Sequence, residues 1–255
     1  LEPEDWTAAW IRRPSGTFEP GQFSYFRREI DLDGDIRRAR AYVSASHAYE
    51  LSVNGERVDR GPALSYPDYQ YYRTVALEEY LSAGANAIGV LHNWNGEGQG
   101  RPPAEPGLVV QLEITLEDGR ERVVTTDGDW RVREGAWLDT DRRNGEIAEP
   151  IEVMDLREIP DGWDEPGFDD SDWETAERVG VHPTEPWERL LGQNRDLARR
   201  EIAPVGVERP DEDTYVFDFG RVYAGVPKIE FAEGTAGDRV AIRAGFRRQA
   251  DGTVD

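Results

Sequence analysis

The stretch from His92 to Gly100, HNWNGEGQG, contains the residue types and spacing in this chain that are closest to a ligand-binding motif. Three glycines, spaced two apart, follow a tryptophan and two asparagines. A phosphate-binding glycine loop needs a strand before it and a helix after it, so that backbone N–H groups and the helix N-terminus converge on the anion. The segment 86–91 (NAIGVL) is typical of a buried strand, but the prolines within 101–107 forbid a helix. The pattern therefore excludes a nucleotide-binding loop.

Aromatic and amide side chains at a strand end are typical of sugar-binding loops. The indole of Trp94 can stack on a pyranose ring, while the amides of Asn93 and Asn95 bond hydroxyl groups. We take His92, Asn93, Trp94 and Asn95 as candidate sugar contacts. The alternative is an irregular loop between two strands, with Trp94 packed beneath it. Because loop tips couple weakly to global stability, we expect Trp94→Ala to leave the fold intact.

Two runs of acidic residues are further candidates for a ligand site, in this case for calcium. In the segment 160–173, PDGWDEPGFDDSDW, the carboxylates of Asp169, Asp170 and Asp172 are weak calcium candidates. Adjacent Asp169 and Asp170 point apart in most turns, so we favour a capped turn whose aromatic residues plug the edge of a sheet. A second run, DLDGDIRRA from Asp31, has its glycine too early for a calcium-binding loop and is predicted to be a turn between strands.

The chain offers no convincing catalytic or cofactor motif. The 52 acidic residues provide many carboxylate pairs and no reason to choose one. The three histidines, His47, His92 and His182, are too scattered for a metal site, and the absence of cysteine excludes a thiolate zinc site and disulfides. We therefore nominate no catalytic residue, no metal and no cofactor.

The charge balance limits the partners. The formal net charge is −22, from 52 acidic against 30 basic residues, and Lys228 is the only lysine. Nucleic acids and anionic membranes bind proteins through clustered positive charge, which a chain of this net charge does not favour. Neither is therefore an expected partner. No apolar run approaches the roughly 18 residues of a membrane span, and no leader-like segment opens the chain. This favours the cytoplasm over secretion, although a chain that begins at Leu1 leaves the compartment undecided.

Acid spread along the whole chain is also typical of proteins from salt-loving organisms, because salt screens the self-repulsion of such a surface. We infer a halophilic source. An ordinary acidic protein from a genome that favours arginine codons is the alternative.

The hydrophobic pattern predicts an all-β fold, since period-2 alternation recurs and helical periodicity is rare. Asn54-Gly55 and Asp118-Gly119 predict two hairpins, the second joined to a strand with leucine, valine and isoleucine on one face from Leu108 to Leu116. A turn or two of helix is expected from Leu77 to Leu81, ended by Gly84, as a connector outside the core. Short strands between frequent turn signals favour an antiparallel β-sandwich of the jelly-roll kind.

Three regions are expected along the chain. Residues 1–180 form the jelly-roll sandwich, residues 181–209 form a linker, and residues 210–255 begin a second β-sandwich. Only about 45 residues follow Asp211, too few for an independent sandwich. Either they add strands to the first domain, or the second domain is cut short.

Six segments in order resemble the amino-terminal part of bacterial and archaeal α-L-rhamnosidases. They are WTAAWI (6–11), SYFRREIDL (24–32), RARAYVSASHAYELSVNGERV (38–58), YRTVALEEYLSAGANAIGVL (72–91), GWDEPGFDDSDW (162–173) and YVFDFGRVYAGVPKIEF (215–231). The resemblance implies a galactose-binding-like β-sandwich followed by the start of a second one. It also implies an inverting parent hydrolase whose acid and base lie in a later α-helical toroid, in a Cys/Ser-Pro-x-Arg segment that this chain does not match.

The resemblance further implies carbohydrate partners with rhamnose, and the missing catalytic domain of the same parent chain. The chain differs from the family pattern at Ala244, Gly245 and Phe246, where family members often have His-Ala-Glu. The resemblance therefore does not identify the exact substrate of the parent enzyme. We expect the non-catalytic portion of an α-L-rhamnosidase-like hydrolase, inactive by itself. A free-standing carbohydrate-binding module is the alternative, and a structural or assembly protein is a third.

Overall fold

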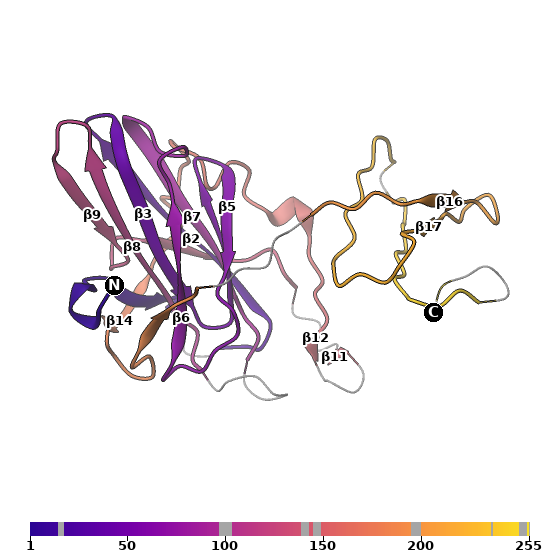
Figure 1. Ribbon diagram of the computed structural model, residues 1–255, viewed down its shortest axis with the longest axis horizontal. Coiled ribbons are helices and arrows are strands. Elements are labelled where there is room, and N and C mark those ends of the chain that lie inside the picture. The colour runs from indigo at the N-terminus through magenta and orange to yellow at the C-terminus, as the bar shows by residue number, and fades with distance from the viewer. Residues whose placement is uncertain are drawn as a thin grey trace. The chain divides into compact units, whose positions relative to one another are not determined.

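The computed structural model describes residues 1–14, 18–96, 104–138, 143–144, 149–194, 200–235, 237–249 and 254. The chain divides into two compact units, Leu1–Arg195 and Asp196–Asp255 (Figure 1). The described part of the chain contains no helix with the length and apolar character to cross a membrane.

Strands dominate the first unit. Its elements are η1 (Pro3–Asp5), β1 (Ala9–Arg12), β2 (Gln22–Leu32), β3 (Ile36–Ala45), β4 (Ala48–Val53), β5 (Glu56–Gly61), β6 (Gln70–Ala76), β7 (Gly84–Trp94), β8 (Leu108–Leu116), β9 (Glu121–Thr125), β10 (Arg131–Glu134), β11 (Arg143–Asn144), β12 (Glu149–Pro150), η3 (Leu156–Glu158), β13 (Glu174–Thr175), β14 (Glu177–Val181) and β15 (Leu190–Gly192).

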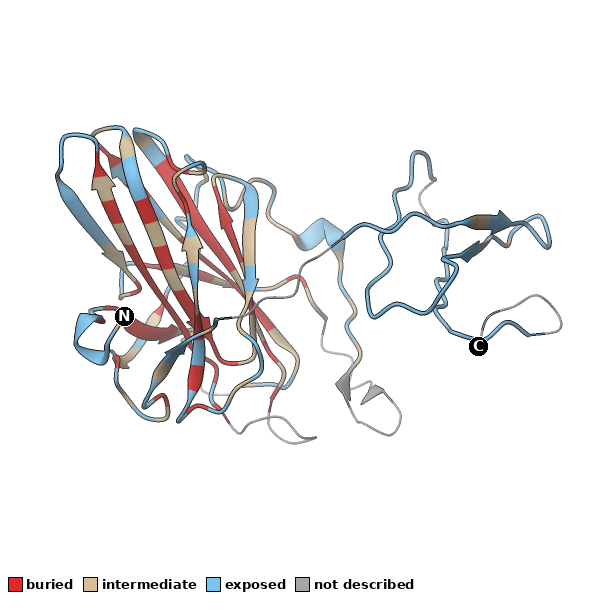
Figure 2. Ribbon diagram, in the orientation of Figure 1, coloured by how far each residue is buried: buried red, intermediate tan, exposed pale blue. Residues whose placement is uncertain are grey.

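Two sheets enclose the main apolar core. One has the order β14-β1-β8-β3-β6-β15 with β9 paired to β8, and the other has the order β13-β10-β2-β7-β4-β5. The pairs are antiparallel except β15 with β6, which is parallel. Buried residues run along the strands of both sheets (Figure 2) and gather into one large cluster between them. The predicted all-β sandwich is confirmed.

The core follows from the alternation that the sequence displays. On β8, the side chains from Leu108 to Leu116 at every second position are buried in the cluster between the sheets. Both predicted hairpins are present, β4–β5 around Asn54-Gly55 and β8–β9 around Gly119, with positive φ at these turn residues. Positive φ is the conformation in which glycine and asparagine carry the smallest steric penalty.

The helix expected from Leu77 to Leu81 is wrong. This stretch is a hydrogen-bonded turn, in which the Leu81 N–H donates to the Leu77 carbonyl over 3.2 Å. So few residues cannot offset the cost of helix nucleation. Both leucines are buried in the core cluster, so the segment is part of the core rather than an external connector. Gly84 does have the expected positive φ, at the start of β7.

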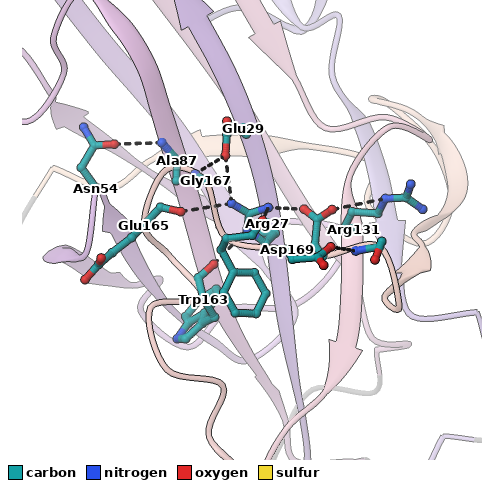
Figure 3. Close-up of polar contacts among 12 residues, drawn as sticks. Arg27, Glu29, Asn54, Ala87, Arg131, Trp163, Glu165, Gly167 and Asp169 are labelled. Carbon is teal, nitrogen blue, oxygen red and sulfur yellow. Dashed lines mark hydrogen bonds and ion pairs between the residues drawn. The ribbon is translucent and has the colours of Figure 1, made fainter.

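The outer face of the β2-containing sheet is covered by the segment 160–173, which is held by a buried arginine (Figure 3). The side chain of Arg27 is 1% exposed. Its guanidinium donates to the carbonyl oxygens of Trp163 (2.9 Å) and Glu165 (3.2 Å) and pairs with Asp170. Burying a guanidinium is costly unless its donors are satisfied, so this position requires the covering segment.

The predicted boundary at residue 180 is too early. Trp187 is fully buried and stacks on Trp10, with ring centroids 4.1 Å apart and planes 8° from parallel. Strand β15 then extends the sheet alongside β6. Much of the expected linker 181–209 therefore belongs to the first unit, which ends at Arg195.

The second unit has little regular structure of its own. Strands β16 (Gly206–Glu208) and β17 (Val216–Asp218) form a two-stranded ladder, and no described residue of the unit is buried (Figure 2). Residues 226–231 and 239–243, which the structure describes, form no strand. That residues 210–255 begin a second sandwich stays a prediction.

An ion pair joins the two sheets through β5 and β6. Asp59 on β5 accepts a bidentate bond from Arg73 on β6, at 2.7 to 3.0 Å, and a bond from the Tyr49 hydroxyl at 2.7 Å. The Arg73 and Asp59 side chains are only 14% and 9% exposed. Bidentate geometry and low exposure make this pair stronger than surface ion pairs.

We predict that Asp59→Asn lowers the free energy of unfolding by about 2 to 4 kcal/mol, because it removes the negative charge that faces the largely buried Arg73 guanidinium in a bidentate pair. Chemical denaturation of the purified chain measures the change. Asp118→Asn is the matched control, since it breaks an Arg–Asp pair whose side chains are both 53% exposed. A denaturation midpoint equally unchanged in both variants would show that the pair does not join the sheets.

Candidate functional site

The chain crosses from one sheet to the other through a two-residue corner. Strand β3 ends at Ala45 in one sheet and β4 starts at Ala48 in the other, so only Ser46 and His47 connect them. His47 has φ +75°, which is uncommon for a residue with a side chain. The Ser46 N–H donates to the Gly107 carbonyl over 2.8 Å, which ties the corner to the start of β8.

The end of β7 lies against this corner. His92 is buried, and its Nε2 lies 2.9 Å from the Ser46 carbonyl oxygen. Because a carbonyl can only accept, Nε2 carries the imidazole proton. Burial lowers the pKa of His92 to about 4, so the ring is neutral near neutral pH. His92 is thus a structural hydrogen-bond donor.

Of the other predicted contacts, Trp94 is buried and the two asparagines are half-buried. Trp94 is 7% exposed, and its Nε1 donates to the Ala104 carbonyl over 2.7 Å. The alternative of an indole packed beneath its loop agrees with this burial, which leaves little ring surface for stacking. Asn93 and Asn95 flank it, and the Asn95 N–H donates to His47 Nδ1 over 2.9 Å. Residues 97–100 of the motif lie outside the described residues.

Sugar binding by these four residues stays a prediction. Because two of them are buried, the four residues do not share one role. His92 and Trp94 support the loop from within, whereas His47, Asn93 and Asn95 keep part of their surface in solvent. Half-exposed amide and imidazole groups can donate to and accept from hydroxyl groups.

An exposed aromatic turn at the same end was missed from the sequence. Tyr66 and Tyr69, before β6, are 61% and 49% exposed. The Gln70 Nε2 donates to the Ala45 carbonyl over 2.9 Å, so this turn neighbours the Ser46–His47 corner. The guanidinium of Arg189 lies 5.1 Å from the Tyr69 ring centroid. The tyrosine-rich stretch SYPDYQYY (65–72) is a signal that the sequence offered. Only the fold brings this turn next to the Ser46–His47 corner.

The weak calcium candidates are occupied by protein partners. Asp169 accepts from the Ser171 N–H over 3.1 Å and caps the turn, whereas Asp170 pairs with Arg27 and lies 3.9 Å from Arg131 (Figure 3). Asp172 is 4.0 Å from the guanidinium of Arg133. The part of the chain that the structure describes contains no group of three or more histidine, aspartate or glutamate side chains placed to hold a metal ion.

We predict that Trp94→Ala lowers the free energy of unfolding by about 3 kcal/mol or more, reversing the expectation drawn from the sequence. The substitution removes a buried large side chain and leaves the Ala104 carbonyl without its donor. Urea denaturation checks this value. Tyr66→Ala, which truncates an exposed ring, is the control and should leave the midpoint near that of the wild type.

The burial of His92 predicts an acid-sensitive fold. Its pKa is about 4 when folded and about 6.5 when unfolded, so the unfolded state takes up the proton first as the pH falls. Neutral His92 therefore contributes about 3 kcal/mol to the free energy of unfolding above pH 6.5. This contribution is lost as the pH falls towards 4.

His92→Gln, which keeps a donor for the Ser46 carbonyl but does not titrate, should flatten this pH dependence in urea titrations between pH 7 and 4.5. A residual slope is expected, because burial also lowers the pKa of His182. If the free energy of unfolding of His92→Gln depends on pH as steeply as that of the wild type, the burial of His92 is not a source of the acid sensitivity.

Comparison with known proteins identifies the family. The α-L-rhamnosidase N-terminal domain family matches residues 34–192. An α-L-rhamnosidase of Streptomyces avermitilis is 30% identical over 263 residues, covering 97% of this chain and 25% of the relative. The chain spans about a quarter of the length of the curated relatives that it matches.

Solved structures agree with this assignment. A GH78 family rhamnosidase of Bacillus sp. GL1 superposes with a TM-score of 0.71 at 28% identity, covering 80% of this chain and 21% of the other. The Streptomyces avermitilis enzyme in complex with L-rhamnose gives a TM-score of 0.64 at 27% identity, covering 79% of this chain and 20% of the other. With its two-sheet sandwich and this match over most of the first unit, the chain belongs to the α-L-rhamnosidase N-terminal domain family.

Proposed function

We propose that this chain serves a glycoside hydrolase that removes terminal α-L-rhamnose, as a non-catalytic scaffold with an accessory sugar contact. The match of residues 34–192 to the N-terminal domain of rhamnosidases carries the proposal. The enzyme's acid and base belong, in this proposal, to a separate helical domain of the parent protein. A rhamnose-containing glycan is the proposed ligand, since relatives are named as rhamnosidases and one was solved with L-rhamnose.

The sugar contact is proposed at the end of the sandwich where three turns meet. His47, Asn93 and Asn95 offer hydrogen-bonding groups there, and Tyr66 and Tyr69 offer exposed rings. Aromatic rings beside a few fixed polar groups are the usual composition of a sugar site.

The second unit supports the scaffold role. Large apolar side chains such as Phe217, Phe231 and Phe246 are 51%, 62% and 76% exposed. Apolar surface on this scale marks a surface that another polypeptide covers. We propose that residues 210–255 begin a second sandwich, completed by further strands of the parent protein.

The alternative is a free-standing carbohydrate-binding module, favoured by the exposed tyrosines of the first unit. Calorimetry with rhamnose-containing oligosaccharides separates the two: a module binds with saturation by itself, whereas a pure scaffold releases no heat of binding. An accessory contact within a scaffold predicts weak but saturable binding that Tyr69→Ala abolishes.

We predict that the purified chain does not hydrolyse an aryl α-L-rhamnoside. An inverting glycosidase needs an acid and a base about 6.5 to 9.5 Å apart across one sugar. Hydrogen bonds from arginine side chains and backbone N–H groups instead keep carboxyl groups of the chain ionised, as at Asp155, whose pKa the Arg157 guanidinium and backbone N–H lower to about 2. Release of the chromogenic aglycone measures activity, and turnover that one carboxylate substitution abolishes would contradict the scaffold proposal.

We also propose a halophilic source and predict that salt stabilises the fold. The net charge of −22 makes the compact state repel itself, and at about 1 M salt the Debye length shrinks to about 3 Å. The melting temperature should therefore rise between 0.1 M and 2 M potassium chloride. A flat or falling melting temperature would contradict the halophilic origin.

A further inference from the structure

The Ser46–His47 corner is held by a tryptophan that is distant in the sequence. The Trp187 Nε1 donates to the Ser46 Oγ over 3.0 Å, and this hydrogen bond is buried. The Trp187 ring also lies against Gly107, where an added Cβ would come within 2.3 Å of it. Trp187 therefore occupies a fixed position directly beside Ser46.

Ser46 connects three segments that converge on the corner. Its N–H donates to Gly107, its carbonyl accepts from His92, and its hydroxyl accepts from Trp187. Every polar group of this buried residue thus has a partner, so the residue has one conformation available to it. The hydroxyl is the part of this network that links the corner to the segment before β15.

Ser46 directly precedes His47, so the contacts that hold Ser46 also hold the backbone that enters His47. His47 has a positive φ, which costs free energy for a residue with a Cβ and persists only where its surroundings enforce it. In that conformation, His47 Nδ1 accepts from the Asn95 N–H over 2.9 Å. The conformation of the Ser46–His47 corner is therefore coupled to that of the loop after β7 through this hydrogen bond.

We propose that Trp187 is a positioning residue for the sugar contact: through Ser46 it holds His47 and Asn95 in the arrangement that meets the glycan. This inference rests on the proposed function. Trp187 itself is fully buried and touches no ligand. A sugar bound by a few hydrogen bonds depends on prior ordering of these groups, because ordering them on binding would reduce the affinity.

Two substitutions test the hydrogen bond from both sides. Trp187→Phe keeps an aromatic ring against Trp10 but removes the donor, and Ser46→Ala removes the acceptor. We expect each to weaken the binding of L-rhamnose or a rhamnose-terminated oligosaccharide about tenfold in calorimetry. Ser46→Thr keeps the hydroxyl and should restore affinity.

Amide hydrogen exchange followed by NMR provides a readout that stability does not mimic. The Asn95 amide should exchange faster in Trp187→Phe and in Ser46→Ala, while the Ala87 amide, which donates to Asn54 Oδ1 at the other end of β7, should not change. Thr126→Val is the matched control, because it removes a buried hydroxyl that bonds the Ala9 carbonyl and leaves the corner intact. It should reduce stability while sugar affinity is unchanged.

The outcomes separate the two proposals. A wild-type chain that binds no rhamnose ligand overturns the sugar contact itself, and the positioning role with it. Wild-type binding together with unaltered affinity and Asn95 exchange in both variants overturns only the role of Trp187. Weaker binding with faster Asn95 exchange at an unchanged Ala87 rate supports it.

Discussion

The crossing between the two sheets at Ser46 and His47 is the constraint on which the rest of the first unit depends. Facing sheets are separated by about 10 Å, so a chain that passes between them in two residues has to turn sharply. The positive φ of His47 makes that turn, and it requires support from outside the corner. His92, Gly107 and Trp187 supply this support from β7, the start of β8 and the segment before β15.

The same constraint explains why aromatic and histidine residues near the loop are buried. Once the corner has formed, its carbonyl and hydroxyl groups lie inside the protein and need donors. The imidazole of His92 and the indole of Trp187 reach them while also filling apolar space. Residues that resemble a ligand-binding set in the sequence are in part the donors that the fold itself needs.

Arginine carries the buried positive charge of this acidic protein. Arg27 fixes the segment 160–173 through carbonyl oxygens, and Arg73 on β6 joins its sheet to the other through Asp59 on β5. Both use the planar fork of the guanidinium, which forms several directed hydrogen bonds at once. The acidic surface and these internal arginines are separate features, and the arginines determine which segments cover which face.

The sequence by itself determined the class of fold and its hairpins, because alternation along β8 and the turn residues Asn54-Gly55 and Gly119 act over a few neighbouring residues. It also determined the family, since ordered segments along most of the chain resemble one family. The tertiary structure alone decided which polar residues face solvent. Trp94 and His92 are buried, and Gln70 bonds the Ala45 carbonyl beside the corner, because strands distant in sequence meet there. Trp187 joined the sandwich rather than a linker for the same reason: stacking on Trp10 and bonding to Ser46 are contacts across more than 100 residues, and no local pattern encodes them.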